Sequence, residues 1–476
     1  MISRGQIWDE SEHAHCAWLI VRHAWVPGRD FFQHHFPLFW DILGLYFRAG
    51  GSGPEVLYFG RAIALASLLG GWALLRAAFP GNPNSKDRRW PTGTATLLLI
   101  VVIQLSVKSL LVARPESVAL ALYFLSVWAW CRLGSSRGFV SGVALGLAIC
   151  ASPRLGLLAF GHLLLPGKSA DSRGHGRAFL HLCGASIVTF FAYAWISGYG
   201  LNYYSDALRF SAVAQQIGSG HPGDGAQISR LAFAFFAAAG AIFLGMPAIQ
   251  RRKWGAFSLF WLGLGAATLL TAGKYHYSQA YICILSWSLV MTAYFESRIS
   301  PTSKISPLGG VRRTLGRVIP AALVLAAMAG LVEAIHRNLR DDSGLAHVVR
   351  CRKQLAQLFG PDDTILATTG RHPIVVRDSS FYSVILIESN DRLGETLRAA
   401  GLRNPSQVDY ASDIVSHRPV LVDDFIPFLA PPPQSQEISL ILKTGYWRVG
   451  PYFLRRDQIL KYSSLSNAIE TCNSIN

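Results

Sequence analysis

The sequence predicts an α-helical multi-pass membrane protein, with about ten transmembrane helices and a small C-terminal α/β extracytoplasmic domain. Of its 476 residues, 51% are hydrophobic and only 15% are charged, and the mean hydropathy is +0.30. Apolar stretches of about 17 to 25 residues recur, and each is long enough to cross a bilayer. The net charge is +16, but Lys and Arg lie mostly in short loops between apolar segments. That pattern is typical of charge that sets membrane topology, and it excludes nucleic acid as the expected partner.

The segment before the first apolar stretch is acidic and rich in histidine. Asp9 followed by Glu12 is similar to a capping box at the start of an amphipathic helix over residues 10–25, lying on the membrane surface. Helical spacing also places Glu10 beside His13, where the two side chains either ligate a metal or form a solvated face. The residues alone leave both interpretations open.

The predicted spans follow one another from residue 54 to residue 335, separated by polar loops. They lie near residues 54–79, 92–112, 115–133, 138–151, 153–166, 178–198, 229–249, 255–272, 278–295 and 314–335. The two segments from 138 to 166 are short, so they form either one helix kinked at Ser152 to Arg154 or a tightly turned pair. The pair is favoured, because only then do the basic loops all fall on one side, which is cytoplasmic by the positive-inside rule.

With that topology, the N-terminal segment and the C-terminal domain share the extracytoplasmic side. Arg114, Arg154 and Lys274 occupy turns on this side, where the positive-inside rule supplies no reason for a cation. Snorkelling to lipid phosphate is the alternative for any one of them. Three cations facing a carboxylate-rich loop instead predict an anionic ligand held by several positive charges.

The chain changes character near residue 340. An amphipathic helix is expected over 345–360, and a rigid turn at the three prolines 431–433. Strand-like runs cover 364–369, 373–378, 419–425 and 446–456. Cys351 and Cys472 pair if this domain is extracytoplasmic, and a role in binding the acceptor or covering the site is expected. The predicted regions are therefore 1–53, an extracytoplasmic loop with interfacial helices; 54–335, the transmembrane bundle; and 336–476, the soluble α/β domain.

Taken in order, the N-terminal residues resemble the first extracytoplasmic loop of the glycosyltransferase C superfamily, in particular protein O-mannosyltransferases and the aminoarabinose transferase of lipid A. Asp9-Glu10, His13, Asp30-Phe31-Phe32 and His35-x-Pro37 match that loop. A second signature of the family, Arg-Pro-acid at the start of a helix, is matched by Arg114, Pro115 and Glu116. A glycine-rich helix ending in the basic turn at Arg154 and the late turn "KYHY", with His276 and Tyr277, are also similar to the family pattern.

The resemblance implies an inverting transfer of a sugar from a polyprenyl-phosphate donor to an acceptor hydroxyl on a glycan, lipid or protein. No cofactor is required, and a divalent metal is optional. The implied catalytic residues are Asp9, as general base, with Glu10 and Asp30; the donor-phosphate ligands are Arg114, Arg154 and Lys274; the supporting residues are His13, His35, Glu116, His276 and Tyr277; and the metal ligands, if a metal binds, are Glu10, His13 and His35. The implied location is the bacterial inner membrane, with the site facing the periplasm or the cell exterior.

One departure concerns the start of the chain. The family's loop follows a first transmembrane helix, but Asp9 is preceded here by only eight residues. Either the start codon is placed too far downstream, or that helix has been lost. Two other functions stay open: a transporter or lipid flippase with a soluble extracytoplasmic domain, and a non-catalytic member of the superfamily. Transporters usually place their site at the bilayer midplane between internal repeats, and no such repeat is seen in the sequence.

Overall fold

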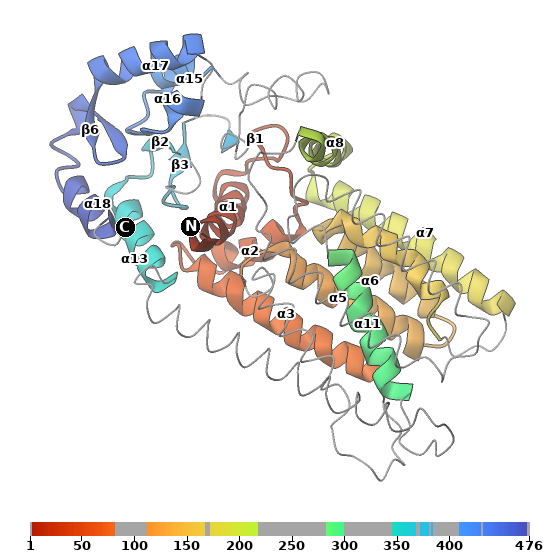
Figure 1. Ribbon diagram of the computed structural model, residues 1–476. Helices are drawn as coiled ribbons and strands as arrows, with labels where there is room; N and C mark the ends of the chain where they lie inside the picture. Colours follow the sequence, from red (N-terminus) through yellow and green to blue (C-terminus); the bar gives the residue numbers. More distant parts are fainter. Residues whose placement is uncertain are drawn as a thin grey trace. The chain divides into compact units, whose positions relative to one another are not determined.

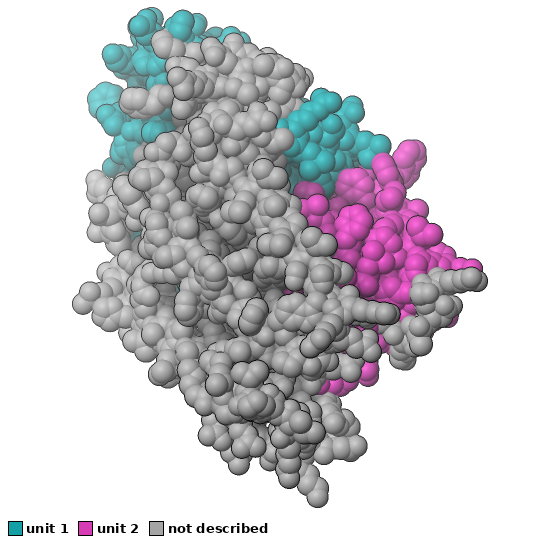
Figure 2. Space-filling view, turned by 45° about the vertical axis from the view of Figure 1, so that its right-hand side comes forward, with its two compact units in different colours: residues 1–61, 197–219, 338–476 teal, residues 62–196, 220–337 magenta. Residues whose placement is uncertain are grey.

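The computed structural model describes residues 2–80, 112–166, 172–217, 282–298, 345–367, 372–379, 382–383, 409–429 and 432–473. The chain divides into two compact units, coloured separately in Figure 2. Unit 1 comprises residues 1–61, 197–219 and 338–476, and unit 2 comprises residues 62–196 and 220–337. The predicted spans near 229–249, 255–272 and 314–335 lie outside the described residues, as does 92–112 except for its last residue. Each unit is described by itself below.

Unit 2 is a bundle of helices (Figure 1). Its described elements are most of α3 (Val56–Ala78), followed by α5 (Pro115–Arg132), α6 (Arg137–Ala151), the 3₁₀ helix η1 (Pro153–Leu163), α7 (Ser172–Ser197) and α11 (Ile282–Arg298). These elements coincide with the predicted segments 54–79, 115–133, 138–151, 153–166, 178–198 and 278–295, so the helical character predicted there is confirmed.

The chain reverses direction after α6. Ser152 is extended and is followed at once by η1, which packs against α6. Near the far end of this pair, Ser126 Oγ lies 2.8 Å from the carbonyl oxygen of Ser141 on α6 and 2.9 Å from His162 Nε2 on η1. The segments 138–151 and 153–166 therefore form a pair and not one kinked helix. At about 2.0 Å per residue, η1 is only about 22 Å long, which is shorter than the hydrocarbon core of a bilayer.

Helices α6 and α7 pack backbone against backbone through glycines spaced four residues apart. A Cβ atom added to Gly142 would lie 2.5 Å from the carbonyl oxygen of Leu182, a distance at which the helices must separate. Small residues at this spacing allow close approach of helices, as is common in membrane bundles. The facing pairs are Gly138 with Ala178, Gly142 with Leu182 and Gly146 with Ser186.

Two described helices are long and apolar enough to cross a membrane: α3 and the stretch Gly174–Ser197 of α7. Helix α7 exposes an extensive apolar surface, with Trp195 at 87% and Ile196 at 82% exposure. In water such a surface would be unfavourable, because exposed apolar area raises the free energy. The described part of the chain thus shows a mainly helical protein with two candidate membrane spans and a small sheet.

Unit 1 contains a five-stranded mixed sheet in the order β3-β2-β5-β7-β6. The strands β3, β2 and β5 are parallel, whereas β7 is antiparallel to both β5 and β6. The strand bounds are β2 (Thr364–Leu366), β3 (Arg377–Asp378), β5 (Leu421–Asp423), β6 (Tyr446–Val449) and β7 (Tyr452–Arg455). Each of the four predicted strand-like runs contains at least one of these strands, and the last forms a hairpin.

Helices cover both faces of this sheet, because successive strand residues alternate between two apolar cores. Leu366 and Val422 belong to the core beneath α15, α16 and α17, whereas Ile365 and Leu421 belong to the core beneath α13 and α18 (Figure 1). The bounds are α13 (Leu345–Leu358), α15 (Tyr410–His417), α16 (Ile426–Leu429), α17 (Pro432–Gly445) and α18 (Leu465–Asn473). The predicted helix at 345–360 is confirmed.

The predicted turn at the three prolines is wrong in part, because α17 begins at Pro432. Proline lacks a backbone N–H, but the first turn of a helix has no intrahelical acceptor for that group, so proline fits there. Cys351 on α13 is disulfide-bonded. The predicted partner, Cys472, belongs to α18, which packs against α13.

The N-terminal segment belongs to the same unit as this α/β fold. It forms α1 (Ile2–His23), β1 (Phe31–Phe32) and α2 (Leu38–Arg48), and α1 packs against α2. Strand β1 pairs in parallel with β4 (Tyr382–Ser383), and this pairing links the N-terminal segment to the C-terminal part of the chain. Helix α8 (Leu201–Ile217) completes the unit: Tyr203 donates its hydroxyl hydrogen to the carbonyl oxygens of Gln33 and His35.

Candidate functional site

Helix α1 carries the acidic and histidine-rich block, but it is not the surface helix that the capping pattern predicted. It begins at Ile2, so Asp9 lies within the helix and does not cap it. Glu10, Glu12, His13 and His15 are all buried, at 0 to 3% exposure. Burial of ionisable groups is unfavourable unless they are paired or hydrogen-bonded, so this face of α1 is expected to find partners within the protein.

Glu10 has such a partner in Arg61, in the second turn of α3. The guanidinium donates through Nε and Nη2 to the two carboxylate oxygens, at 2.8 Å each. A two-pronged pair of this kind fixes orientation as well as charge. Arg61 was not among the residues that the sequence predicted for the site; the signal for its role was that a lone cation near the start of an apolar span requires an anion. Helix α1 carries the carboxylates Asp9, Glu10 and Glu12. Of these three, only Asp9 is half-buried, whereas Glu10 and Glu12 are buried.

The structure brings His13 and His35 together, as the motif suggested. Their ring centroids are 4.7 Å apart, and His34 lies 4.1 Å from His35 in the same way. Trp40 Nε1 donates to His13 Nδ1 at 2.9 Å. Because Nδ1 accepts this hydrogen bond, the proton of neutral His13 is carried by Nε2.

Asp30 is placed in a tight turn that follows α1. Its carboxylate accepts a hydrogen bond from the backbone N–H of Val26 at 2.8 Å, and Arg29 pairs with it at 2.7 Å. The hydrogen bond from the Arg29 guanidinium holds the pKa of the Asp30 carboxyl below its usual value. These contacts fit a residue that shapes the loop leading to β1, rather than one that exchanges protons with a substrate.

The predicted phosphate-binding residues belong to unit 2, where two of the three are described. Arg114 precedes α5 and lies 3.4 Å from Glu116, and both side chains are buried. Arg154, in the first turn of η1, is close enough to interact electrostatically with both. Cys283, at the start of α11, donates its S–H to the carbonyl oxygen of Arg154 at 2.9 Å, which brings α11 to the same end of the bundle. Lys274, His276 and Tyr277 lie outside the described residues.

The predicted metal ligands do not form a site. Both oxygens of Glu10 are taken by Arg61, and Nδ1 of His13 is taken by Trp40. Within the described residues, a different group has its ligand atoms within 4.8 Å of one another: His15 on α1, with His372 and Asp378 from the α/β fold, all buried. This group was missed by sequence reasoning.

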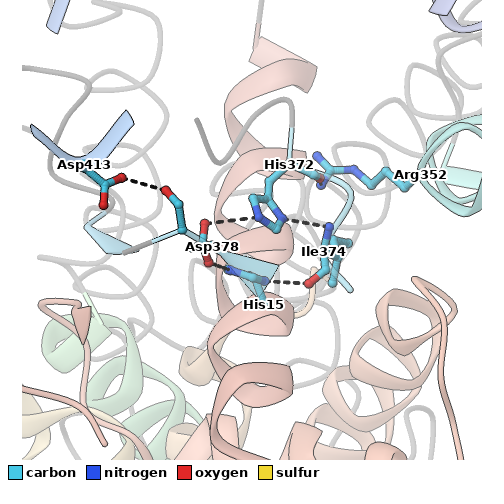
Figure 3. A network of polar contacts seen from close by, with 7 residues as sticks. His15, Arg352, His372, Ile374, Asp378 and Asp413 are labelled. Atoms are coloured by element: carbon cyan, nitrogen blue, oxygen red, sulfur yellow. Dashed lines mark hydrogen bonds and ion pairs between the residues drawn. The ribbon is translucent and has the colours of Figure 1, made fainter. Parts of the chain in front are cut away.

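Figure 3 shows how the three side chains meet. His15 Nε2 lies 2.6 Å from Asp378 Oδ2, and His15 Nδ1 lies 2.5 Å from the carbonyl oxygen of Ile374. Both ring nitrogens of His15 therefore face oxygen atoms that can accept a hydrogen bond. The ring of His372 lies beside that of His15, with centroids 3.9 Å apart, and its Nε2 is 3.3 Å from Asp378 Oδ1.

Ile374 organises both histidines through its backbone. Its N–H donates to His372 Nδ1 at 3.0 Å, so neutral His372 carries its proton on Nε2, toward Asp378. Ile374 has φ +72°, an unfavourable conformation for a β-branched residue. A metal would need the Nε2 lone pair of His372, which this tautomer occupies with a proton. The three residues therefore fit an ion pair with a second hydrogen-bond donor better than they fit a metal centre.

The surroundings hold this network in place and set its charges. Arg352 donates to the carbonyl oxygen of His372, and Ser379 Oγ donates to Asp413 at 2.7 Å (Figure 3). Burial, reinforced by the charge of His15, lowers the pKa of His372 to about 4. Burial alone would raise the pKa of Asp378, but the two histidines outweigh it and lower that pKa to about 2. Near neutral pH the Asp378 carboxylate is thus ionised and the His372 imidazole is neutral.

Comparison of the chain with protein-family models, with curated proteins and with solved structures finds no match. The interpretation of the site therefore depends on its residues and their geometry.

Proposed function

We propose that this protein is an inverting glycosyltransferase that transfers a sugar from a polyprenyl-phosphate donor to an acceptor hydroxyl, on the extracytoplasmic side of a bacterial inner membrane. The observation that carries the proposal is the difference in burial between two neighbouring carboxylates of α1, Asp9 and Glu10. Glu10 is buried and paired with Arg61, whereas its neighbour Asp9 is half-buried and so can be reached by a substrate. A general base must touch the proton that it removes, and the exposure of Asp9 supports its choice for this role.

In the proposed reaction each predicted residue has its own role. The Asp9 carboxylate removes the proton of the acceptor hydroxyl while the hydroxyl oxygen attacks the anomeric carbon. The bond between the anomeric carbon and the phosphate oxygen breaks, its electron pair leaves with the lipid phosphate, and the anomeric configuration inverts. Arg114 and Arg154 stabilise the charge that develops on the phosphate, because preorganised cations act most strongly on charge that appears in the transition state. Lys274 is proposed as a third cation of this group.

The membrane location is supported by the character of the helices. Helix α7 exposes large apolar side chains and packs on α6 through glycines, both of which suit a helix surrounded by lipid. We propose that the remaining predicted spans complete a multi-pass bundle of about ten helices. The disulfide at Cys351 suits an oxidising compartment, which favours the extracytoplasmic side for the α/β fold.

The function is tested in membranes from cells that express the chain, with radiolabelled polyprenyl-phosphate mannose as the probe donor. Label is counted in the lipid, glycan and protein fractions, which also identifies the acceptor class. Asp9→Asn should abolish transfer, with a loss on the order of a thousandfold or more, while the amount of protein in the membrane is unchanged. The matched control is Asp424→Asn, because Asp424 is a carboxylate in an exposed pair with Arg448.

Full transfer by Asp9→Asn would remove Asp9 as the base. Movement of the labelled donor across the membrane without a new glycosidic bond would instead identify a flippase.

A further inference from the structure

Unit 1 contains a pocket of about 310 Å³, bounded by the last turns of α1, the loop before α3, the loop between α13 and β2, and the residues that lead into β3. That volume is at the lower end of the range for small-molecule sites, which is about 300–1,000 Å³. Four segments from distant parts of the sequence form this pocket, and it does not include Asp9, Arg114 or Arg154. Its charge and its walls indicate what it binds.

Two guanidinium groups line the pocket, and neither has a carboxylate partner among the described residues. Arg22 donates from Nη2 to the carbonyl oxygen of Gly51 at 2.9 Å, which leaves most of its five N–H donors for other acceptors. Arg377, exposed at the edge strand β3, makes no ion pair with any described residue. The charge of Arg377 also acts on His23, which lines the same pocket, and together with burial it lowers the pKa of that imidazole.

The pocket has one carboxylate among its lining residues, and that group is already compensated. Asp363 accepts hydrogen bonds from Lys461 Nζ at 3.1 Å, from the Tyr462 hydroxyl and from the backbone N–H of Gly360. The two arginines therefore give the pocket a net positive charge. Guanidinium groups bind phosphate through paired N–H donors, so a phosphate is the ligand group that suits them best.

The remaining wall is apolar. Trp18 stacks on His15 with ring centroids 5.7 Å apart, and Val375, Val376, Phe359 and Pro361 lie around the pocket. An apolar wall beside two cations fits a phosphate that is attached to an organic group, rather than a bare ion. Ser52, which also lines the pocket, lies just before α3, a candidate membrane span. The pocket is therefore close to the start of a helix that suits a bilayer.

We propose that this pocket binds a phosphate group carried by an organic ligand, with Arg22 and Arg377 as the donors and Trp18 as part of the apolar wall. The ligand is either a lipid with a phosphate head group or a soluble organic phosphate, and both offer the same chemistry to the arginines. This site goes beyond the proposed transfer reaction and does not depend on it, because binding can be measured without turnover.

The test uses the full chain in detergent micelles and isothermal titration calorimetry. The probes are dihexanoyl phosphatidic acid, glycerol 3-phosphate and dihexanoylglycerol, the last of which has the acyl chains without the phosphate. Phosphatidic acid or glycerol 3-phosphate should bind, and dihexanoylglycerol should not. Tighter binding of phosphatidic acid identifies a lipid site, whereas equal affinity for glycerol 3-phosphate identifies a soluble ligand.

The double variant Arg22→Gln/Arg377→Gln should weaken binding at least about tenfold, since hydrogen bonds between charged groups are stronger than those between neutral groups. The matched control, Arg448→Gln, removes an exposed arginine from β6 and should leave binding unchanged. Arg377 is exposed and forms no ion pair with a described residue, so Arg377→Gln alone keeps the test valid if the double variant unfolds. Unchanged affinity in Arg377→Gln and in the double variant, or no binding of either phosphate by the natural protein, overturns the proposal.

Discussion

Helices α1 and α7 are of similar length, with 22 and 26 residues, but their environments are opposite. Helix α1 buries ionisable side chains such as Glu10 and His15 at 0 to 1% exposure. Helix α7 exposes apolar side chains such as Trp195 and Ile196 at more than 80%. The two helices are therefore adapted to different surroundings. Helix α1 is surrounded by protein, where its ionisable side chains find partners. Helix α7 has the apolar surface of a helix that faces lipid.

The largest effect is expected from breaking the ion pair that holds α1. Asp378→Asn removes the buried carboxylate that contacts both His15 and His372, which should lower the free energy of unfolding by about 3–5 kcal/mol. Chemical denaturation in detergent measures this change. Asp424→Asn, which breaks an exposed pair with Arg448, should change it by only about 0–1 kcal/mol. Equal effects of the two substitutions would show that α1 is not held by its buried charges.

The next largest effect is the pH dependence of the free energy of unfolding, which arises from His372 and Asp378 in the same network. The pKa of His372 is about 4 in the folded protein and 6.5 in the unfolded chain, so the unfolded chain binds more protons between these values. Stability should therefore fall as the pH is lowered from 6.5 to about 4, by on the order of 3 kcal/mol. A further loss should follow from 3.8 to about 2, as Asp378 is protonated.

His372→Asn is the matched variant for this titration. Its side-chain oxygen can accept the N–H of Ile374 in place of Nδ1, but it does not titrate. The loss of stability between pH 6.5 and 4 should become smaller in this variant, while the loss below pH 3.8 remains. An unchanged pH profile would assign the titration to another group.

A smaller effect is expected from the packing of α7. Gly142→Ala places a Cβ 2.5 Å from the carbonyl oxygen of Leu182, which forces α6 and α7 apart and should destabilise the bundle by about 1–3 kcal/mol. Gly184→Ala on α7 is the control, because nothing lies within 4 Å of the added atom. It should leave the thermal unfolding midpoint unchanged or raise it, since alanine favours helices by up to ~1 kcal/mol. The same loss in both variants would argue against close packing at Gly142.

The smallest effect on stability is expected from Trp195 on α7, and its fluorescence tests whether this helix faces lipid. Trp195→Phe should change the free energy of unfolding by no more than about 0.5 kcal/mol, because the side chain is 87% exposed. In nanodiscs with brominated lipids, bromine quenches the fluorescence of tryptophans that contact lipid. The fraction of tryptophan fluorescence that is quenched should therefore decrease in this variant. Trp130→Phe, at a fully buried position, should leave that fraction unchanged. No difference between the variants would place Trp195 away from lipid.

Periodicity and composition predicted most of the local structure correctly. The apolar segments at 54–79 and 115–133 are helices, and the run at 446–456 is a hairpin, because these patterns reflect local backbone preferences and burial. The apolar segment 138–151 was likewise predicted as a helix, but its packing against α7 was not. The predicted start of α1 near residue 10 was wrong, because the helix begins at Ile2. The capping pattern at Asp9 is a local signal, and it does not show whether the residues before it are also helical.

The candidate site was predictable only in part. The motif that resembles the family loop brought Asp9, Glu10, His13 and His35 to attention, and the structure gathers His13 and His35. It did not reveal Arg61, nor the pairing of His15 with Asp378, which lie 363 positions apart. A single sequence contains no information about which distant residues meet, so the partner of a buried charge cannot be inferred from spacing.

The sequence by itself determined that this chain is rich in apolar helices, that its charges gather in loops, and that a small α/β fold ends it. These properties depend on residue type and local order. Only the tertiary structure decided that one face of α1 is buried, that Glu10 pairs with Arg61 while Asp9 is half-buried, and that His15 meets Asp378. The physical reason is that the state of an ionisable group depends on the donors, acceptors and charges within a few ångströms of it, and folding alone determines which those are.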